Sequence, residues 1–311
     1  MDNKKKNILF IVNPISGTGK QNNIQEKVNQ LLSNKKFNVS FKFTERAEHA
    51  VEIAREAGAS GVDIVAVVGG DGSVNEVAKG LLNSKVAMAV IPTGSGNGLA
   101  RHLKIPCNVD KALLLLNDSK EWCIDTCEID RRFFVGAAGL GFDALIAHEF
   151  PKLKRRGFAS YIKVFLKNYF SYANKTYSLK CENQNTDSEY FVCSFLNSSQ
   201  YGNGTVISPK SVIDDGEFEV VCIKKIPLLL LPVYAYKLFA GTLKNDKYFH
   251  SYSAKSVSVK TQNAIAHIDG EPIALANEFE VKINRKSLWV MVGSNFGNSI
   301  DPETSSGSIE S

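Results

Sequence analysis

The sequence lacks any apolar run long enough to cross a membrane. Its most apolar stretch, 226–243, is broken by Pro227 and Pro232 and carries Lys237. It therefore falls short of the roughly 20 apolar residues of a spanning helix. The apolar run 8–12 follows three lysines, but it is too short for a signal peptide. We therefore expect no transmembrane segment, and a buried first strand at 8–12.

The sequence also lacks cysteine motifs and a large net charge. The six cysteines form no CxxC pair and no zinc-like spacing, which predicts reduced, mostly buried thiols in a cytoplasmic protein. The net charge of +5, from 37 Lys and Arg against 32 Asp and Glu, is too small for a dedicated nucleic-acid binder. It is compatible with anionic ligands or an anionic membrane surface. No nucleic-acid partner is predicted.

No internal repeat is visible, and 44% hydrophobic residues, 22% charged residues and nine prolines are typical of a folded globular protein. The 311 residues exceed the roughly 100–200 of one domain. Near Asp125 the pattern changes from short apolar runs alternating with helical segments to strand-like segments joined by polar turns. This change predicts a first domain over 1–124 and a second over 125–297. The Ser- and Glu-rich tail, 298–311, is expected to be disordered.

The first half predicts an α/β domain. Short Val- and Ile-rich runs alternate with helical apolar spacing, which is typical of a parallel sheet with helices on both faces. The strands, all expected to be fully buried, are 8–12, 39–43, 64–68 and 86–91. The expected helices are 22–34, 48–57 and 74–82.

The second half predicts an antiparallel, β-rich domain, because apolar and polar residues often alternate and polar turns join the segments. The expected strands are 132–137, 177–181, 190–196, 217–223, 256–260 and 288–292. Two helical insertions, 144–172 and 228–243, interrupt them.

The first glycine turn, 13–20, lies between a predicted strand and a predicted helix, where free amides and a helix N-terminus favour phosphate. It is not a Walker A loop. Asn13 stands where that motif needs Gly, and Gln21 follows Lys20 where it needs Ser or Thr. On these residues alone, a plain strand-to-helix turn and a phosphate-binding turn are equally compatible.

The second turn, 69–73, places Asp71 between glycines after a buried strand. Open α/β sheets bind ligands at such strand ends, and glycines let the backbone approach a ligand closely. We therefore expect this turn to be functional, with Asp71 binding a nucleotide's metal or accepting a hydroxyl proton.

The third turn, 92–98, closes the next predicted strand and again opens a helix. One glycine pattern alone would be weak evidence of function. Three such turns at successive strand ends would lie along one edge of a parallel sheet, so together they predict a phosphate site at that edge.

The order of four motifs, NPISG (13–17), GGDGSVNEV (69–77), PTGSGN (92–97) and IDGEP (268–272), resembles the diacylglycerol kinase catalytic family, which includes the sphingosine kinases. The resemblance extends to about residue 297. It implies an ATP-dependent kinase that phosphorylates a lipid hydroxyl, with ATP in a cleft between the α/β and β-rich domains and the lipid entering on the second domain.

The resemblance implies ATP and Mg²⁺ as cofactors. The residues that it assigns to the nucleotide lie in or beside the three turns: Asn13, Pro14, Ile15, Ser16, Gly17, Lys20, Thr44, Gly69, Gly70, Gly72, Ser73, Val74, Asn75, Glu76, Thr93, Gly94, Ser95, Gly96 and Asn97.

Three carboxylates are the candidate catalytic residues. Asp71 matches the acidic residue of the family's GGDG turn, and Asp269 and Glu271 match its DGE turn. Either Asp269 or Glu271 would reach the transferred phosphate or activate the lipid hydroxyl, and the sequence leaves open which is the base. A plain hairpin turn at 269–270 is the alternative.

The segment 208–219 resembles one in which some bacterial members of the family hold a structural magnesium. By that match Asp215 supplies a carboxylate, and Val212 and Glu217 supply backbone carbonyls, all hard oxygen ligands suited to Mg²⁺. An acidic β-turn without metal is the alternative.

Asp143 matches a family position near the lipid headgroup, and we expect it either to orient the acceptor hydroxyl or to cap a helix. The basic and aromatic segment 149–158 and the leucine cluster 228–231 are compatible with a membrane surface or with packing on the second domain. We expect a lipid substrate at the membrane surface and peripheral association with the inner face. A homodimer is compatible with the sequence, which does not determine oligomeric state.

Alternatives to a diacylglycerol kinase remain. Because the turn 94–97 resembles the sphingosine-kinase form, a sphingoid base is the alternative acceptor. An NAD kinase would share the GGDG turn and the two-domain plan, but the first turn and the apolar insertions argue against it. A non-catalytic nucleotide-binding module is disfavoured because Asp71, Asp269 and Glu271 are all present.

Overall fold

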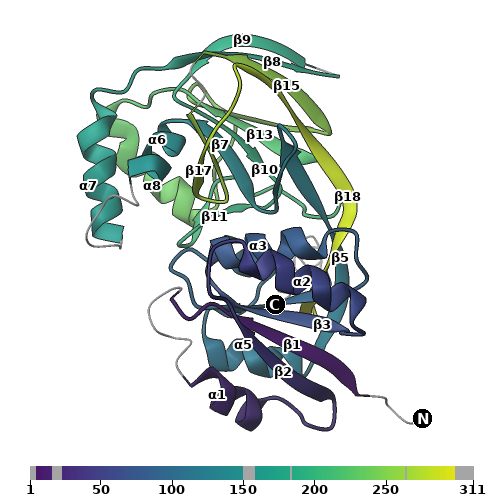
Figure 1. Cartoon of the computed structure of the whole chain (residues 1–311). Helices are drawn as coiled ribbons and strands as arrows, with labels where there is room; N and C mark the ends of the chain where they lie inside the picture. Colours follow the sequence, from purple (N-terminus) through teal and green to yellow (C-terminus); the bar gives the residue numbers. More distant parts are fainter. Residues whose placement is uncertain (1–4, 16–22, 150–157, 183, 263–264, 298–311) are drawn as a thin grey trace, which may run out of the picture.

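The structure is a computed structural model that describes residues 5–15, 23–149, 158–182, 184–262 and 265–297. Figure 1 shows an α/β lobe formed by the first part of the chain and a β-rich lobe formed by the second. Two long strands, β5 (Ser119–Ile129) and β18 (Glu278–Gly293), run between them. The predicted fold class is confirmed.

The α/β lobe is built on four parallel strands in the order β2-β1-β3-β4. Their bounds are β1 Lys6–Val12, β2 Phe37–Phe43, β3 Ile64–Gly69 and β4 Ala87–Pro92. Helices α2 (His49–Ala59) and α3 (Asp71–Leu81) pack together on one side of the sheet, and α1 (Ile24–Leu31) and α5 (Val109–Leu116) lie on the other (Figure 1). The short α4 (Gly98–His102) follows β4.

Two predictions for this lobe were wrong in detail. Strand β2 was expected to be fully buried, but Val39 and Phe43 are 37% and 45% exposed, because β2 stands at the end of the strand order and pairs with β1. Helix α3 was expected to start at Val74 and starts three residues earlier, since the Val74 N–H already donates to Gly70 O at 3.0 Å.

The sheet of the α/β lobe continues into the second half of the chain. Strand β18 pairs in parallel with β4 at Val290 and antiparallel with β5 and β15 (Ser256–Thr261). Leu288 and 290–292 of β18 lie in the core of the α/β lobe. The same sheet extends through β8 (Lys175–Cys181) to β9 (Gln184–Tyr190), and β6 (Arg132–Phe134) pairs with β5. The predicted boundary at 124/125 stays a prediction.

The β-rich lobe adds a six-stranded antiparallel sheet in the order β14-β13-β10-β7-β16-β17. The bounds are β7 Ala137–Gly141, β10 Val192–Leu196, β13 Phe218–Ile223, β14 Phe249–Ala254, β16 Ile265–Ile268 and β17 Glu271–Ala274. A two-stranded hairpin, β11 (Gln200–Gly202) and β12 (Thr205–Val206), lies outside it. One hydrophobic core, with Phe195 and Val220 from this sheet and Leu179 and Val257 from the other, joins the two layers.

The two predicted insertions are helical. The first contains α6 (Phe142–Glu149) and α7 (Phe158–Tyr169), and the second contains a 3-10 turn η2 (Leu228–Leu230) followed by α8 (Leu231–Ala240). Among the described residues, no helix has the length and apolar character needed to span a membrane. All six cysteines are free thiols, of which Cys127, Cys193 and Cys222 are buried.

Candidate active site

The second and third glycine turns and residues 13–15 of the first lie at the carboxyl ends of β3, β4 and β1, which are neighbours in the sheet. A Cβ atom on Gly94 would lie 2.7 Å from the Cα of Gly70, so the second and third turns touch through their backbones. Asn13 Nδ2 of the first turn donates to Ser73 Oγ at 3.1 Å. The structure therefore brings the second turn, the third turn and the described start of the first together along one edge, where the sequence predicts a phosphate site.

This edge offers groups suited to an anion. The second turn leads directly into α3, so the unpaired backbone amides at the start of α3 lie there. The hydroxyl of Thr93, in the third turn, is buried and has no hydrogen-bond partner in the described part of the chain. A buried hydroxyl without a partner costs free energy, which fits a group whose hydrogen bond is completed by a ligand.

The remaining residues predicted to bind the nucleotide differ in their burial and in their position relative to the three turns. Thr44 is buried at the end of β2, where its N–H donates to Val12 O at 2.9 Å. Val74 belongs to the hydrophobic core, and Ile15 is 91% exposed. Pro14, Gly69, Ser95 and Gly96 lie in or next to the three turns. Ser16, Gly17 and Lys20 lie outside the described residues.

Asp71 connects the second turn to the third. Its Oδ1 accepts from Gly98 N at 2.8 Å and its Oδ2 from Asn97 N at 2.9 Å. Burial raises the pKa of the Asp71 carboxyl; the two amides act against that rise and the Asp269 carboxylate adds to it. Both oxygens already accept a hydrogen bond, so Asp71 holds the third turn in place. Its role as base or metal ligand stays a prediction.

Asn75 and Glu76, on the first turns of α3, make structural links. Asn75 Nδ2 donates to Asp269 Oδ2 of the β-rich lobe at 2.6 Å. The Glu76 carboxylate accepts from the backbone N–H groups of Glu48 and Ala50 at 3.1 and 3.3 Å, and so caps the start of α2.

The Asp269–Gly270 pair forms the turn of the β16–β17 hairpin. Both residues have positive φ, 47° and 87°, and Ile268 pairs with Glu271, so the turn is the two-residue hairpin that the sequence left as an alternative. It is also a link between the lobes. Besides Asn75, the Asp269 carboxylate accepts from the three successive backbone amides of 135–137 at 2.8–3.1 Å.

Glu271, directly after this turn, faces the start of α3. A Cβ atom on Gly72 would lie 2.7 Å from Glu271 Oε1. The residue as a whole is exposed, but partial burial of its carboxyl raises the pKa, and the carboxylates of Glu76, Asp269 and Glu48 add to that rise. Within the described residues no hydrogen-bond donor pairs with this carboxylate. It is therefore the candidate carboxylate that is free to accept a proton from a ligand.

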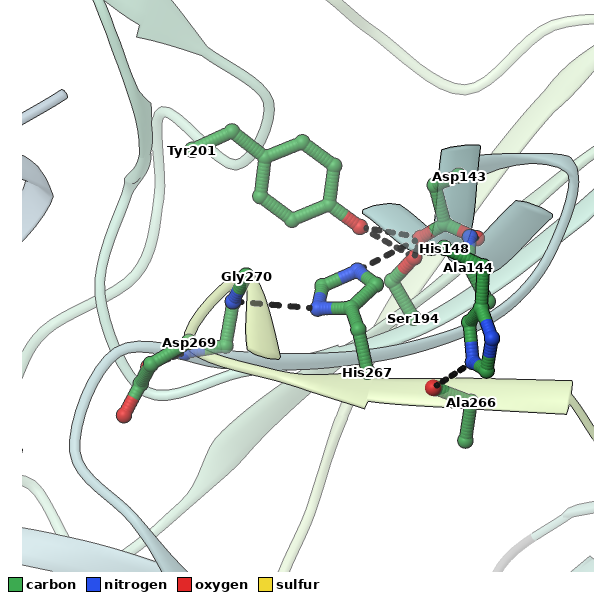
Figure 2. A network of polar contacts seen from close by, with 10 residues as sticks. Asp143, Ala144, His148, Ser194, Tyr201, Ala266, His267, Asp269 and Gly270 are labelled. Carbon is green, nitrogen blue, oxygen red and sulfur yellow. Dashed lines mark hydrogen bonds and ion pairs between the residues drawn. The ribbon is translucent and has the colours of Figure 1, made fainter. Parts of the chain in front are cut away.

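Asp143, the residue predicted to contact the acceptor, lies at the centre of a polar network on the same lobe (Figure 2). Its Oδ2 accepts from Ser194 Oγ at 3.0 Å and from Tyr201 Oη at 2.9 Å, and lies 3.3 Å from His267 Nε2. The hydroxyl groups of Tyr201 and Ser194 also contact each other. Asp143 Oδ1 accepts from Ala144 N, within the first turn of α6, at 2.8 Å; whether it orients the acceptor hydroxyl or caps the helix stays a prediction.

The segment predicted to hold magnesium packs on a buried carboxylate, Asp125, which accepts from Gly216 N at 2.7 Å and Lys286 N at 2.6 Å. Asp215 Oδ1 accepts from Glu217 N at 3.0 Å. Burial raises the pKa of the Asp215 carboxyl, with Glu217 and Asp125 adding to the rise. Val212 is exposed. No three His, Cys, Asp or Glu side chains of the described residues group around a metal position, and the magnesium site stays a prediction.

Sequence reasoning missed a second contact between the lobes. His102 Nδ1 accepts from Ser199 N at 3.1 Å, and Asn203 N donates to Gly96 O at 3.0 Å. Burial lowers the pKa of His102 to about 4, so the ring is neutral at neutral pH. An Asn-Gly dipeptide such as 203–204 is typical of a tight turn. The contact of this turn with Gly96 in the third glycine turn could not be predicted, because it depends on the tertiary fold.

The arrangement is that of a kinase: an α/β lobe presents three glycine turns, and a hairpin from a β-rich lobe places carboxylates against them. Residues 7–129 match the diacylglycerol kinase catalytic domain, and residues 136–291 match the YegS C-terminal NAD kinase beta sandwich-like domain. The chain belongs to the diacylglycerol kinase and YegS family of lipid kinases, enzymes that transfer phosphate to an alcohol group. The predicted family and enzyme class are confirmed.

Similar proteins cover most of the chain. "Diacylglycerol kinase" of Bacillus subtilis is 26% identical over 272 residues, 86% of this chain and 90% of that protein. "Probable lipid kinase YegS" of Escherichia fergusonii is 30% identical over 215 residues, 67% of this chain and 71% of that protein. The crystal structure of a diacylglycerol kinase from Bacillus anthracis str. Sterne shares the fold, with a TM-score of 0.71, 20% identity, and coverage of 94% of this chain and 99% of that one.

Proposed function

We propose that this lipid kinase transfers the γ-phosphate of ATP to the hydroxyl of diacylglycerol. The observation that carries the proposal is the position of Glu271. Its carboxylate faces Gly72 at the start of α3, beside the edge where the three glycine turns meet. A phosphate bound at that edge and a hydroxyl held by the β-rich lobe would meet at this carboxylate.

Glu271 is the proposed general base. Asp71 and Asp269 are less suited to the role, because each of their oxygens already accepts at least one hydrogen bond that holds a turn. The raised pKa of Glu271 makes the carboxylate a stronger proton acceptor than an ordinary glutamate. Asp71 and Asp269 then act as positioning residues for the turns around it.

The nucleotide would bind along the glycine edge, with its phosphates against the amides at the start of α3. The predicted residues 13–17 and Lys20 would complete that contact. The donor set predicted for magnesium, Asp215 with the carbonyls of Val212 and Glu217, fits a hard cation. Burial raises the pKa of the Asp215 carboxyl and the nearby Glu217 and Asp125 add to the rise, and a bound cation would offset both effects. There Mg²⁺ would supply structural charge neutralisation, and a nucleotide-bound Mg²⁺ would neutralise the phosphates.

The acceptor hydroxyl would approach Asp143. Three donors, Ser194, Tyr201 and His267, already face one oxygen of this carboxylate. Its charge is therefore largely compensated, which favours a neutral hydroxyl headgroup over the ammonium group of a sphingoid base. A compensated carboxylate has less to gain from a cation. This supports diacylglycerol as the acceptor.

We also propose that the protein reaches its substrate by peripheral contact with an anionic membrane through η2 and α8. Helix α8 buries none of its residues, and the exposed apolar side chains of this segment include Leu229 at 91% and Tyr236 at 73%. The surrounding stretch, 224–247, contains five lysines and one acidic residue. An apolar face flanked by lysines suits the interface of an anionic bilayer. Of the other predicted membrane contact, 149–158, residues 150–157 lie outside the described residues.

The acceptor is tested by incubating purified protein with labelled ATP, Mg²⁺ and, in parallel, diacylglycerol, sphingosine and NAD, and by separating the products by thin-layer chromatography. We expect label in the diacylglycerol product. Label in the sphingosine product alone would change the acceptor to a sphingoid base. Label in NAD alone would overturn the proposed function.

A further inference from the structure

His267 lies on β16 of the six-stranded sheet, between β7 and the edge strand β17, beside a glycine that leaves room for it. Gly139 of β7 pairs with Ser194 of β10 on one side and with His267 of β16 on the other. A Cβ atom on Gly139 would lie 2.1 Å from Asp143 Oδ2 and 2.5 Å from His267 Nε2. Because position 139 has no side chain, the carboxylate and the imidazole can meet above the strand.

The two ring nitrogens of His267 face two different partners (Figure 2). Nδ1 accepts from Gly270 N at 3.4 Å, and Nε2 lies 3.3 Å from Asp143 Oδ2. Since Nδ1 accepts a hydrogen bond, the ring hydrogen is on Nε2 and is donated to Asp143. One imidazole therefore joins the Asp143 cluster to the turn that carries Glu271.

The turn 269–270, which directly precedes Glu271, makes two separate sets of contacts. The Asp269 carboxylate ties it to α3 and to the amides of 135–137. His267 ties it to Asp143 through the backbone of Gly270. The Asp143 side is almost buried, with 11% of the Asp143 side chain and 8% of the His267 side chain exposed. A shift of Asp143 is therefore transmitted through packed groups rather than through solvent.

We propose that His267 is a positioning residue that couples the acceptor contact at Asp143 to the placement of Glu271. The proposal rests on the proposed function, because it takes Asp143 as the acceptor contact and Glu271 as the base. When the acceptor hydroxyl engages Asp143, the imidazole aligns Gly270, and with it the Glu271 carboxylate, for proton transfer. Phosphate transfer then depends on both contacts of the ring.

Two conservative variants separate the two contacts. His267→Asn keeps a polar atom near the position of Nδ1 and removes the contact with Asp143. His267→Gln keeps a polar atom near the position of Nε2 and removes the contact with Gly270. We expect each to lower kcat for diacylglycerol about tenfold, the scale of one lost hydrogen bond, with KM for ATP unchanged. His148→Asn, which alters a contact with Ala266 O and none with Asp143 or Gly270 among the described residues, is the matched control and is expected to keep wild-type kcat.

A double-mutant cycle tests the coupling itself. If His267 acts through Asp143, the loss in kcat of His267→Asn combined with Asp143→Asn equals that of the larger single change instead of the product of both. Independent, multiplicative losses would overturn the proposal, as would wild-type kcat in both His267 variants. A fall in thermal stability with unchanged kcat would assign His267 a purely structural role and also overturn it. A wild-type protein that phosphorylates no lipid would instead refute the proposed function and the coupling with it.

Discussion

Gly72 lies directly against the carboxylate of Glu271, so that a Cβ atom at position 72 would be 2.7 Å from Glu271 Oε1. The two residues come from different lobes and are 199 positions apart in the chain. The second glycine turn of the α/β lobe and the hairpin of the β-rich lobe therefore both contribute to the candidate site, which neither lobe forms alone.

Substitution of Gly72 by Ala is expected to lower activity without unfolding the protein. The added methyl group meets only the end of an exposed side chain, and Ala is favoured over Gly in a helix by about 1 kcal/mol. Displacement of the Glu271 carboxylate should lower kcat at least about tenfold. Thermal unfolding and kinase assays on the same preparation check both parts.

The matched control is Gly80→Ala on the same helix, where the Cβ would lie 2.6 Å from Val51 O and 2.7 Å from Ala54 Cβ. These are packed groups of α2, so we expect a loss of about 1–3 kcal/mol in the free energy of unfolding. Equal stability losses in the two variants would contradict the placement of Glu271.

The raised pKa of Glu271 predicts the pH dependence of catalysis. A base must be deprotonated, so kcat/KM should rise as pH rises through the pKa of Glu271. Glu48→Gln removes one of the carboxylates that raise this pKa, and should move the acidic limb to lower pH by about half a unit or less. Glu52→Gln removes a carboxylate of α2 paired with Arg46, and should leave the limb in place. An identical shift in both variants would argue against Glu271 as the titrating base.

His102 predicts a pH dependence of stability. Its pKa of about 4 in the folded protein lies below the ordinary 6.5, so the unfolded chain binds the proton more tightly. The stabilisation is fully present above pH 6.5 and is lost as pH falls towards about 4, with a limit of about 3 kcal/mol. His102→Asn retains a polar atom facing Ser199 N and removes this titration. Urea unfolding between pH 4 and 7 should show a flatter dependence for the variant, and an unchanged slope would contradict the burial of His102.

Membrane contact through α8 predicts weaker vesicle binding when its exposed apolar residues are made polar. Leu229→Ser combined with Tyr236→Ser should lower the fraction of protein that sediments with vesicles of anionic phospholipid by about tenfold or more. Leu114→Ser changes an exposed leucine, 50% accessible, on α5 of the other lobe, and should leave binding unchanged. Equal binding by all variants would refute this docking surface.

Much of the architecture could be predicted from the sequence because it depends on local patterns. The buried strands β1, β3 and β4 are continuous apolar runs, and the turns after them contain the glycines that a close backbone approach requires. Pairing partners are not local. Nothing in 288–292 indicates that this strand returns to the core of the α/β lobe, and the exposure of β2 follows from its place at the end of the strand order.

The sequence offers the candidate site residues, but not the different surroundings that the fold gives them. Asp71, Asp269 and Glu271 are equivalent as carboxylates in sequence, whereas the fold surrounds the first two with backbone amides and leaves the third for a ligand. Tyr201, Ser194 and His267 carry no sequence signal of their own. Ser194 and His267 join Asp143 because β10 and β16 flank β7 in one sheet, and Tyr201 reaches it from the separate hairpin strand β11.

The central claim is that Glu271 accepts the proton of a lipid hydroxyl during phosphate transfer from ATP. The most direct measurement is the rate of transfer of labelled phosphate to diacylglycerol by the wild-type protein and by Glu271→Gln. We expect the variant to be slower by about 10²–10⁴-fold, with its KM for ATP little changed. Transfer by Glu271→Gln at the wild-type rate would contradict the claim.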